Sequence, residues 1–317
     1  MKDFGAKFRL IILPFLIISV GTVFVYSIVH WWLFIQNETF AVDEAILNFA
    51  APIVISFLPA IIWMLPRLKL LDFTGKKIRN PLTGYFFLAW IAITAPAIIA
   101  QEYLISATGK LTALRSVSQI SNQPKTKYYT VKNVFADKEQ TRSYTRLNTI
   151  GKYKDQYNMA IYMPCPLYDA GIAKTKPEAR EPLVWIGIKY QKTISNRLSE
   201  EEKTRAFEAF AKQSEIDFDN RDLTTFTYLD RIGPNRELSF FADAITFSGV
   251  NDAPFIVLVP RWSRFEDRNG DKDLWLIGSL LFGALLFTIT VSLIPLKAEP
   301  VNDGDTKYVF ETYKLER

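Results

Sequence analysis

The chain has 317 residues, of which 49% are hydrophobic and 22% are charged, and its formal net charge is +5. The 38 basic and 33 acidic residues are mixed along the sequence, whereas phosphate binding requires clustered Lys and Arg, so the charge pattern argues against a nucleic-acid partner. With one cysteine and one histidine, the chain forms no disulfide of its own, and most histidine-based metal sites and histidine-dependent reactions are excluded within one chain.

Three long apolar segments occupy most of the first 104 residues, at residues 10–35, 45–65 and 85–104. The first segment is longer than the core of a signal peptide and lacks a small-residue cleavage site, so it predicts a retained transmembrane helix. Pro52 and Pro59 in the second segment and Pro96 in the third predict bends, at which neighbouring helices must satisfy the freed carbonyl groups. We therefore expect residues 1–104 to form three transmembrane helices.

Tryptophans flank the expected membrane helices. Trp31 and Trp32 lie near the end of the first helix, and Trp275 lies at the start of a fourth apolar segment, residues 274–295. Because Trp is enriched in the headgroup layer, we expect these three side chains at the membrane interface. His30 is either a proton relay or an interfacial side chain with a local hydrogen bond, and its position favours the second interpretation.

The short loops predict one orientation in the membrane. Residues 1–9 and 66–84 are basic, whereas residues 36–44 contain three acidic residues and no basic one. The positive-inside rule places the basic loops in the cytoplasm. Residues 105–272 are then exported to the periplasmic side of the inner membrane, and residues 273–317 form a fourth transmembrane helix and a short cytoplasmic tail. The N- and C-termini are both expected in the cytoplasm.

Strand patterns dominate the exported segment. They predict strands at residues 128–135, 141–148, 156–163, 184–190, 226–229 and 255–259. Alternating apolar residues at 184–190 predict a half-buried strand. Ser199 and Glu202 have the spacing of a capping box, so a helix is expected to begin there and to end near residues 214–217. A second helix is expected at 238–245. The sum is an α+β domain with a mostly antiparallel sheet.

The residues that could act as metal ligands or nucleophiles also have structural interpretations. The acidic clusters at residues 217–222 and 267–273 have oxygen-rich spacing, but neither provides the Gly and distal Glu of an EF-hand, so a solvated loop and an Asn-Gly turn are favoured over calcium sites. Cys165 lies between two prolines and is expected to be a small packing residue rather than a reactive thiol. We expect no catalytic residue, cofactor or metal ligand in this chain.

Several short strings in the sequence resemble the N-terminal region of certain large bacterial rhomboid-family membrane proteins. They lie at residues 100–103 (AQEY), 109–111 (GKL), 127–130 (KYYT), 183–190 (LVWIGIKY), 192–199 (KTISNRLS), 217–219 (DFD) and 228–233 (YLDRIG). The resemblance implies a relation to a family of intramembrane serine proteases, which use a serine in Gly-x-Ser and a histidine on a later helix. Ser279 lacks the context of that serine, and no histidine follows His30, so the dyad has no counterpart here.

Two hypotheses on function follow. In the first, the chain is a non-catalytic inner-membrane protein that presents its exported domain for protein–protein interaction, as an accessory module or as a subunit of an envelope complex. Its partners are then membrane lipids and a membrane or periplasmic protein. In the second, the chain is a portion of a rhomboid-type intramembrane serine protease whose catalytic part lies outside this chain.

Overall fold

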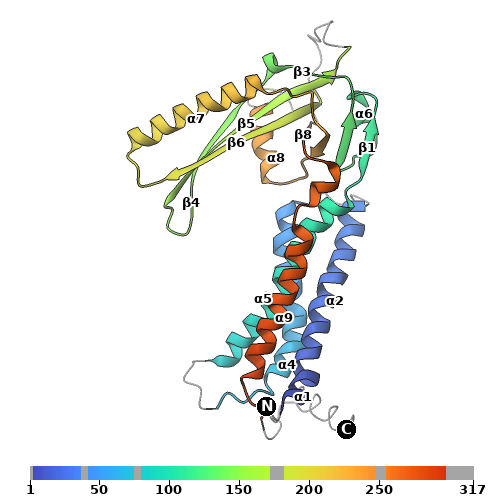
Figure 1. Ribbon diagram of the computed structural model, residues 1–317, viewed down its shortest axis with the longest axis vertical. Helices are drawn as coiled ribbons and strands as arrows, with labels where there is room; N and C mark the ends of the chain where they lie inside the picture. The colour runs from blue at the N-terminus through green and yellow to red at the C-terminus, as the bar shows by residue number, and fades with distance from the viewer. Residues whose placement is uncertain (1–2, 37–41, 75–79, 172–181, 247–254, 298–317) are drawn as a thin grey trace. The chain divides into compact units, whose positions relative to one another are not determined.

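The computed structural model describes residues 3–36, 42–74, 80–171, 182–246 and 255–297 (Figure 1). The chain divides into two compact units, each with its own core. The helical unit comprises Met1–Thr108 and Asn269–Arg317, and the sheet unit comprises Gly109–Arg268. Each unit is described separately below.

Four helices in the described residues are long and apolar enough to cross a membrane, as the sequence predicts. The first two contain π-helical turns, written η1 to η4, and the third is a single α-helix. Their segments are α1 (Phe4–Lys7), η1 (Phe8–Ile12), α2 (Leu13–His30) and η2 (Trp31–Gln36) in the first helix, η3 (Ile46–Ala50), α3 (Ala51–Pro59), η4 (Ala60–Met64) and α4 (Leu65–Leu68) in the second, and α5 (Pro81–Thr108) in the third. The fourth helix is α9 (Lys272–Ser292), preceded by the 3₁₀ turn η7 (Phe265–Asn269).

The π-helical turns lie directly before three of the four prolines in the first two helices. Pro14, Pro52 and Pro66 each lie in the first two residues of an α-helical segment that directly follows a π-helical turn. A proline cannot donate to the carbonyl four residues earlier, and a π-helical turn changes which carbonyls are bonded at that point. The second helix therefore continues to Leu68, so the expectation that Pro66 begins a loop is wrong.

The core of the helical unit lies among the four helices. Its completely buried side chains include Ile11 and Phe15 of the first helix, Met64 of the second and Phe287 of α9. The rings of Phe15 and Phe287 stack with their centroids 4.0 Å apart. A Cβ atom at Gly283 of α9 would lie 3.2 Å from the Cβ of Ala92, so small residues allow α5 and α9 to approach closely.

The sheet unit contains one eight-stranded sheet in the order β1-β2-β7-β8-β6-β5-β3, and β4 also pairs with β5. Two pairs, β1 with β2 and β6 with β8, are parallel, and the other pairs are antiparallel. The predicted α+β domain with a mostly antiparallel sheet is thus confirmed. The strands are β1 (Leu111–Leu114), β2 (Tyr128–Val131), β3 (Val134–Ala136), β4 (Tyr144–Ile150), β5 (Gln156–Asp169), β6 (Val184–Ser195), β7 (Tyr228–Arg231) and β8 (Ile256–Arg261).

Helices cover both faces of this sheet. The short α6 (Ser118–Asn122) and the long α7 (Glu200–Asn220) pack on one face, and α8 (Arg236–Thr246) packs on the other. Residues 184–188 of β6 are consequently all buried. The sequence alternation predicted a half-buried strand, and this prediction is wrong because Trp185 packs against α8 while its neighbours on β6 face α6 and α7.

Several element boundaries also differ from the sequence prediction, and two of these differences have a visible cause. The expected strand at 128–135 is two strands, β2 and β3, separated at Asn133, whose φ is +56°. Helix α7 continues past residue 217 to Asn220. Lys138 explains this length, because its Nζ atom donates to the carbonyls of Phe218, Asp219 and Arg221 at 3.1, 2.7 and 2.7 Å. A cation stabilises the unpaired carbonyls at a helix C-terminus.

A substitution at Gly187 tests how tightly β6 packs against β8 and α8. A Cβ atom at this position would lie 2.7 Å from Cγ1 of Val257 and 2.9 Å from Cζ of Phe241. We expect Gly187→Ala to lower the free energy of unfolding of the sheet unit by about 1–3 kcal/mol, because the buried neighbours must move. Thermal unfolding of the purified full chain measures the effect. Gly171→Ala is the control, since its Cβ meets nothing within 4 Å, and equal melting temperatures for the two variants would contradict the packing.

Candidate functional site

Three strands and one helix of the sheet unit form an arm, residues 144–162 and 187–220. In β6 the pairing with β8 ends at Ile186, and the rest of β6 pairs only with β5. The first half of β5, residues 156–162, pairs with β4 on its other side. Helix α7 runs along one face of these strands (Figure 1). The arm therefore extends beyond the strands that make up the rest of the sheet.

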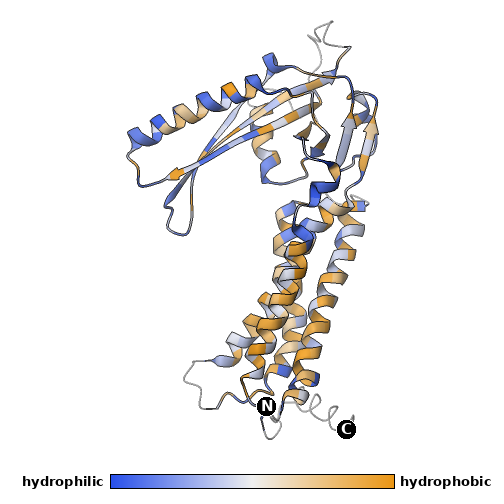
Figure 2. Ribbon diagram, in the orientation of Figure 1, coloured by the Kyte–Doolittle hydropathy of each residue, from blue (hydrophilic) through white to orange (hydrophobic). Residues whose placement is uncertain are grey.

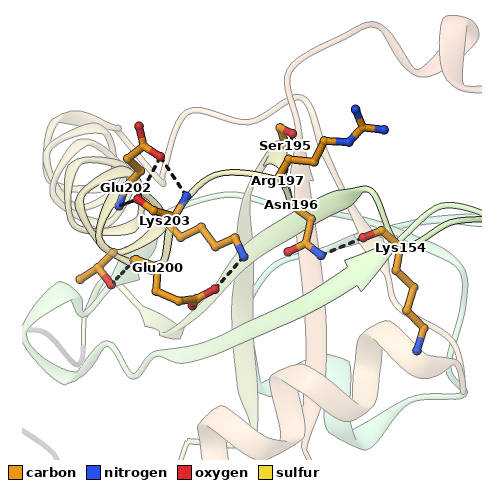
Figure 3. Close-up of polar contacts among 9 residues, drawn as sticks. Lys154, Ser195, Asn196, Arg197, Glu200, Glu202 and Lys203 are labelled. Carbon is orange, nitrogen blue, oxygen red and sulfur yellow. Dashed lines mark hydrogen bonds and ion pairs between the residues drawn. The ribbon is translucent and has the colours of Figure 1, made fainter.

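Two turns meet at the tip of the arm, and Asn196 links them. The β4–β5 turn reverses through Gly151 and Lys154, whose φ angles are +92° and +53°. The backbone N–H of Asn196 donates to the carbonyl of Asp155 at 2.8 Å, and its Nδ2 atom donates to the carbonyl of Lys154 at 2.8 Å (Figure 3). These bonds fix the β4–β5 turn to the segment that leads from β6 into α7.

The first turn of α7 is held by the capping box that the sequence predicts. The Oγ atom of Ser199 accepts from the backbone N–H of Glu202 at 3.3 Å, and the backbone N–H of Ser199 donates to Oε2 of Glu202 at 2.9 Å (Figure 3). The donors around the carboxylate lower the pKa of Glu202, the backbone bond being the largest cause. Two of the unpaired N–H groups at the helix start are thereby satisfied.

Lys203 packs the start of α7 onto the arm. Its Nζ atom lies 2.8 Å from Oε1 of Glu200 and 5.5 Å from the ring centroid of Tyr157 on β5. The Lys203 side chain is only 11% exposed, whereas that of Glu200 is 89% exposed. The lysine is thus a structural residue of the arm, and its charge is largely covered.

The tip presents cations and one aromatic ring to solvent. Tyr153 is 79% exposed, and the ammonium of Lys152 lies 5.5 Å from its ring centroid. Lys154 and Arg197 are also exposed, and Arg197 extends away from the bonded residues in Figure 3. Tyr and Arg are enriched at the centres of protein–protein interfaces. The tip is therefore a candidate contact site for another protein. The sequence analysis did not predict this site, although a turn with a glycine and a central tyrosine between two predicted strands indicates an exposed loop.

The expected interface tryptophans lie on the helical unit. Trp31 and Trp32 belong to the π-helical turn η2, and both are exposed. Trp275 is exposed in the first turn of α9, where its N–H donates to the carbonyl of Asp271 at 3.0 Å. Their position at a membrane interface stays a prediction. None of the three belongs to the tip of the arm.

His30 is buried between helices rather than exposed at a surface. It is 2% exposed, and its Nδ1 atom donates to Oε1 of Gln101 at 2.7 Å. The Nε2 atom of Gln101 donates in turn to Ser27 at 3.3 Å and to the carbonyl of Ala97 at 2.9 Å. The expectation of a local hydrogen bond is wrong, because the partner of His30 is on α5. This contact ties α2 to α5.

The two acidic clusters are distributed over helix ends and turns. Asp217 and Asp219 belong to the last turns of α7, and Asp217 accepts from Gln213 at 2.8 Å. Asp222 accepts from the N–H and the hydroxyl of Thr224 at 2.8 and 2.6 Å. In the second cluster, Gly270 has φ +52°, as in a turn. Within the described ranges, no group of three or more His, Cys, Asp or Glu side chains is placed to hold a metal ion.

Cys165 and Ser279 do not have the surroundings of nucleophiles. Cys165 is completely buried on β5, and burial raises the pKa of its thiol to about 11, so the interpretation as a packing residue is confirmed. The Oγ atom of Ser279 donates to the carbonyl of Leu276 in its own helix at 2.8 Å. In the part of the chain that the structure describes, neither residue bonds to a histidine.

Comparisons of the chain with protein-family models, curated proteins and solved structures find no match. The function is therefore inferred from the geometry.

The capping box at the tip is testable through Ser199. We expect Ser199→Ala to lower the free energy of unfolding by about 1 kcal/mol, because the backbone N–H of Glu202 loses its acceptor. Hydrogen exchange at residues 200–203 should also become faster. Ser199→Asp is the matched control, since Asp is an equally good N-cap residue. If the Ala and Asp variants have the same stability and the same exchange rates, the capping box does not stabilise the arm.

Proposed function

We propose that the chain is a non-catalytic, multi-pass protein of the inner membrane that presents its sheet unit on the periplasmic side and contacts another protein through the tip of the arm. It acts in this proposal as an accessory module or a subunit of an envelope complex. The membrane lipids are its second partner.

The surface of the helical unit supports insertion into a membrane. Large apolar side chains are exposed on all four helices, including Phe24, Val54, Ile91 and Phe282. Figure 2 shows hydrophobic residues along the four long helices, whereas polar residues predominate on α7. Exposed apolar surface of this extent requires a covering, and the hydrocarbon of a bilayer matches helices of this length.

The charges around the helices support the proposed orientation. Arg67 and Lys69 follow the apolar part of the second helix, and Nη1 of Arg67 donates to the carbonyl of Trp63 at 2.7 Å. Basic residues at this end match the cytoplasmic side under the positive-inside rule. Asp43 and Glu44 precede the same helix at its other end. The connections that lead into the sheet unit then belong to the periplasmic side.

The tip of the arm is the observation that carries the proposed protein contact. Backbone and capping hydrogen bonds fix the two turns, which carry the exposed ring of Tyr153 and three exposed cations, Lys152, Lys154 and Arg197. Turns whose backbone is already fixed lose little conformational entropy on binding. The partner should present acidic or carbonyl groups and an apolar recess for the tyrosine ring.

The rhomboid-type protease portion is the alternative proposal, and no contact in the described residues favours it. His30 bonds to Gln101, and Ser279 bonds to its own helix backbone. A protease reaction would thus depend on groups outside this chain.

Photocrosslinking at Tyr153 tests the proposed contact. A photoreactive phenylalanine analogue at this position in the full chain, irradiated in intact cells, should yield one discrete adduct heavier than the 36.4 kDa chain. The same analogue at Ile216, an exposed apolar position on α7, should yield no such adduct. An adduct of twice the chain mass would identify a second copy as the partner. The proposal fails if neither position gives an adduct, or if both give the same one.

A further inference from the structure

The outer edge of β4 is an open sheet edge without a charged side chain directed along it in the described parts of the chain. All seven residues of β4 pair one to one with β5, from Tyr144 opposite Tyr162 to Ile150 opposite Gln156. Strand pairing within the described residues leaves the other side of β4 open. Alternate residues of an antiparallel strand direct their N–H and C=O groups away from the paired neighbour. The edge therefore offers a row of backbone donors and acceptors.

Natural sheets protect such edges. Residues 187–195 of β6 also pair on one side only, but that edge carries the exposed Lys189 and Lys192. The other two edges are protected by being short. β1 has four residues and β3 has three. Short edges, prolines, bulges and charges all prevent unwanted pairing. β4 contains no proline, and its register with β5 shows no bulge. Its only charge is that of Arg146, whose guanidinium carbon lies 4.2 Å from the ring centroid of Phe240 on α8. That charge is thus drawn toward α8.

The sequence of β4 is complementary to itself in the antiparallel direction. With Leu147 at the centre, Leu147 of one copy faces Leu147 of the other. Thr145 then faces Thr149, Tyr144 faces Ile150, and Arg146 faces Asn148. Thr–Thr pairs and aromatic–β-branched pairs are among the stabilising cross-strand pairs of antiparallel sheets.

Burial and charge select this register. Leu147 is 45% exposed in the single chain, and a second leucine opposite it would cover that surface. Centring the pair on Arg146 instead would place two arginines directly opposite each other, which is destabilising. Shifting the pairing by one residue would exchange the faces of every side chain.

We propose that the outer edge of β4 pairs with the same edge of a second copy of this chain, antiparallel and with Leu147 on the two-fold axis. The two eight-stranded sheets then form one continuous sheet. This interface goes beyond the contact proposed for the tip, because it uses only the edge of β4. It is isologous, so it closes after two copies and creates no further open edge of this length.

Disulfide crosslinking of the full chain in membranes tests the register. A thiol introduced by Leu147→Cys faces its own copy across the axis, and directly opposed strand residues are close enough for a disulfide. Mild oxidation with diamide should convert this variant to a covalent dimer. Tyr153→Cys is the control, because the two copies of residue 153 lie at opposite ends of the paired strands, and it should remain monomeric. The native Cys165 is buried and stays in place. Equal crosslinking of both variants, or of neither, overturns the proposal.

Charge exchange at the same position tests the interface without oxidation. Leu147→Lys and Leu147→Glu each place like charges on the axis, so each alone should dimerise about tenfold more weakly than the native chain. A mixture of the two variants should form mixed dimers with restored affinity. Leu147 is half exposed, and unchanged thermal unfolding of both variants checks that they fold. Mass photometry of the purified full chain gives the oligomeric state. A native chain that is monomeric, or dimers unaffected by either charge, would overturn the proposal.

Discussion

The pairing of β5 with β6 is the interaction on which the sheet unit depends. Eleven consecutive residue pairs join the two strands, from Gln156 opposite Ser195 to Pro166 opposite Trp185. Every other sheet element attaches to one of these strands directly or through β8. Their side chains supply buried residues to the clusters on both faces of the sheet. Any change that shifts this register by one residue would move each of those side chains to the opposite face.

The length of this pairing also produces the arm and the two surfaces for which we propose contacts. β5 and β6 extend beyond β8. In this extended part, α7 covers one face of the two strands and β4 pairs with the free side of β5. α7 is fixed at its start by Ser199 and at its end by Lys138, so the arm is clamped at both ends of its helix. The exposed tip and the open edge of β4 both result from the extension of β5 and β6 beyond β8.

Local patterns in the sequence predicted the structural features that depend on residues close together in the chain. The capping box at Ser199 predicted the start of α7, and continuous apolar segments predicted the four long helices. Contacts between distant residues were not predictable. The end of α7 depends on Lys138, the burial of β6 depends on α8, and the position of His30 depends on Gln101. The tip was not predicted, because its geometry depends on a hydrogen bond between two turns that are far apart in the sequence.

We propose that a membrane separates the two termini, on its cytoplasmic side, from the sheet unit on its periplasmic side, and thiol labelling in intact cells tests this proposal most directly. The native Cys165 gives little background, because it is completely buried and burial raises its thiol pKa to about 11. With Gln123→Cys, an exposed position on the sheet unit, a maleimide that cannot cross the inner membrane should label the chain in intact cells whose outer membrane is permeabilised. With Asp3→Cys, labelling should require lysis. Labelling of Asp3→Cys but not of Gln123→Cys in such cells would contradict the proposed topology.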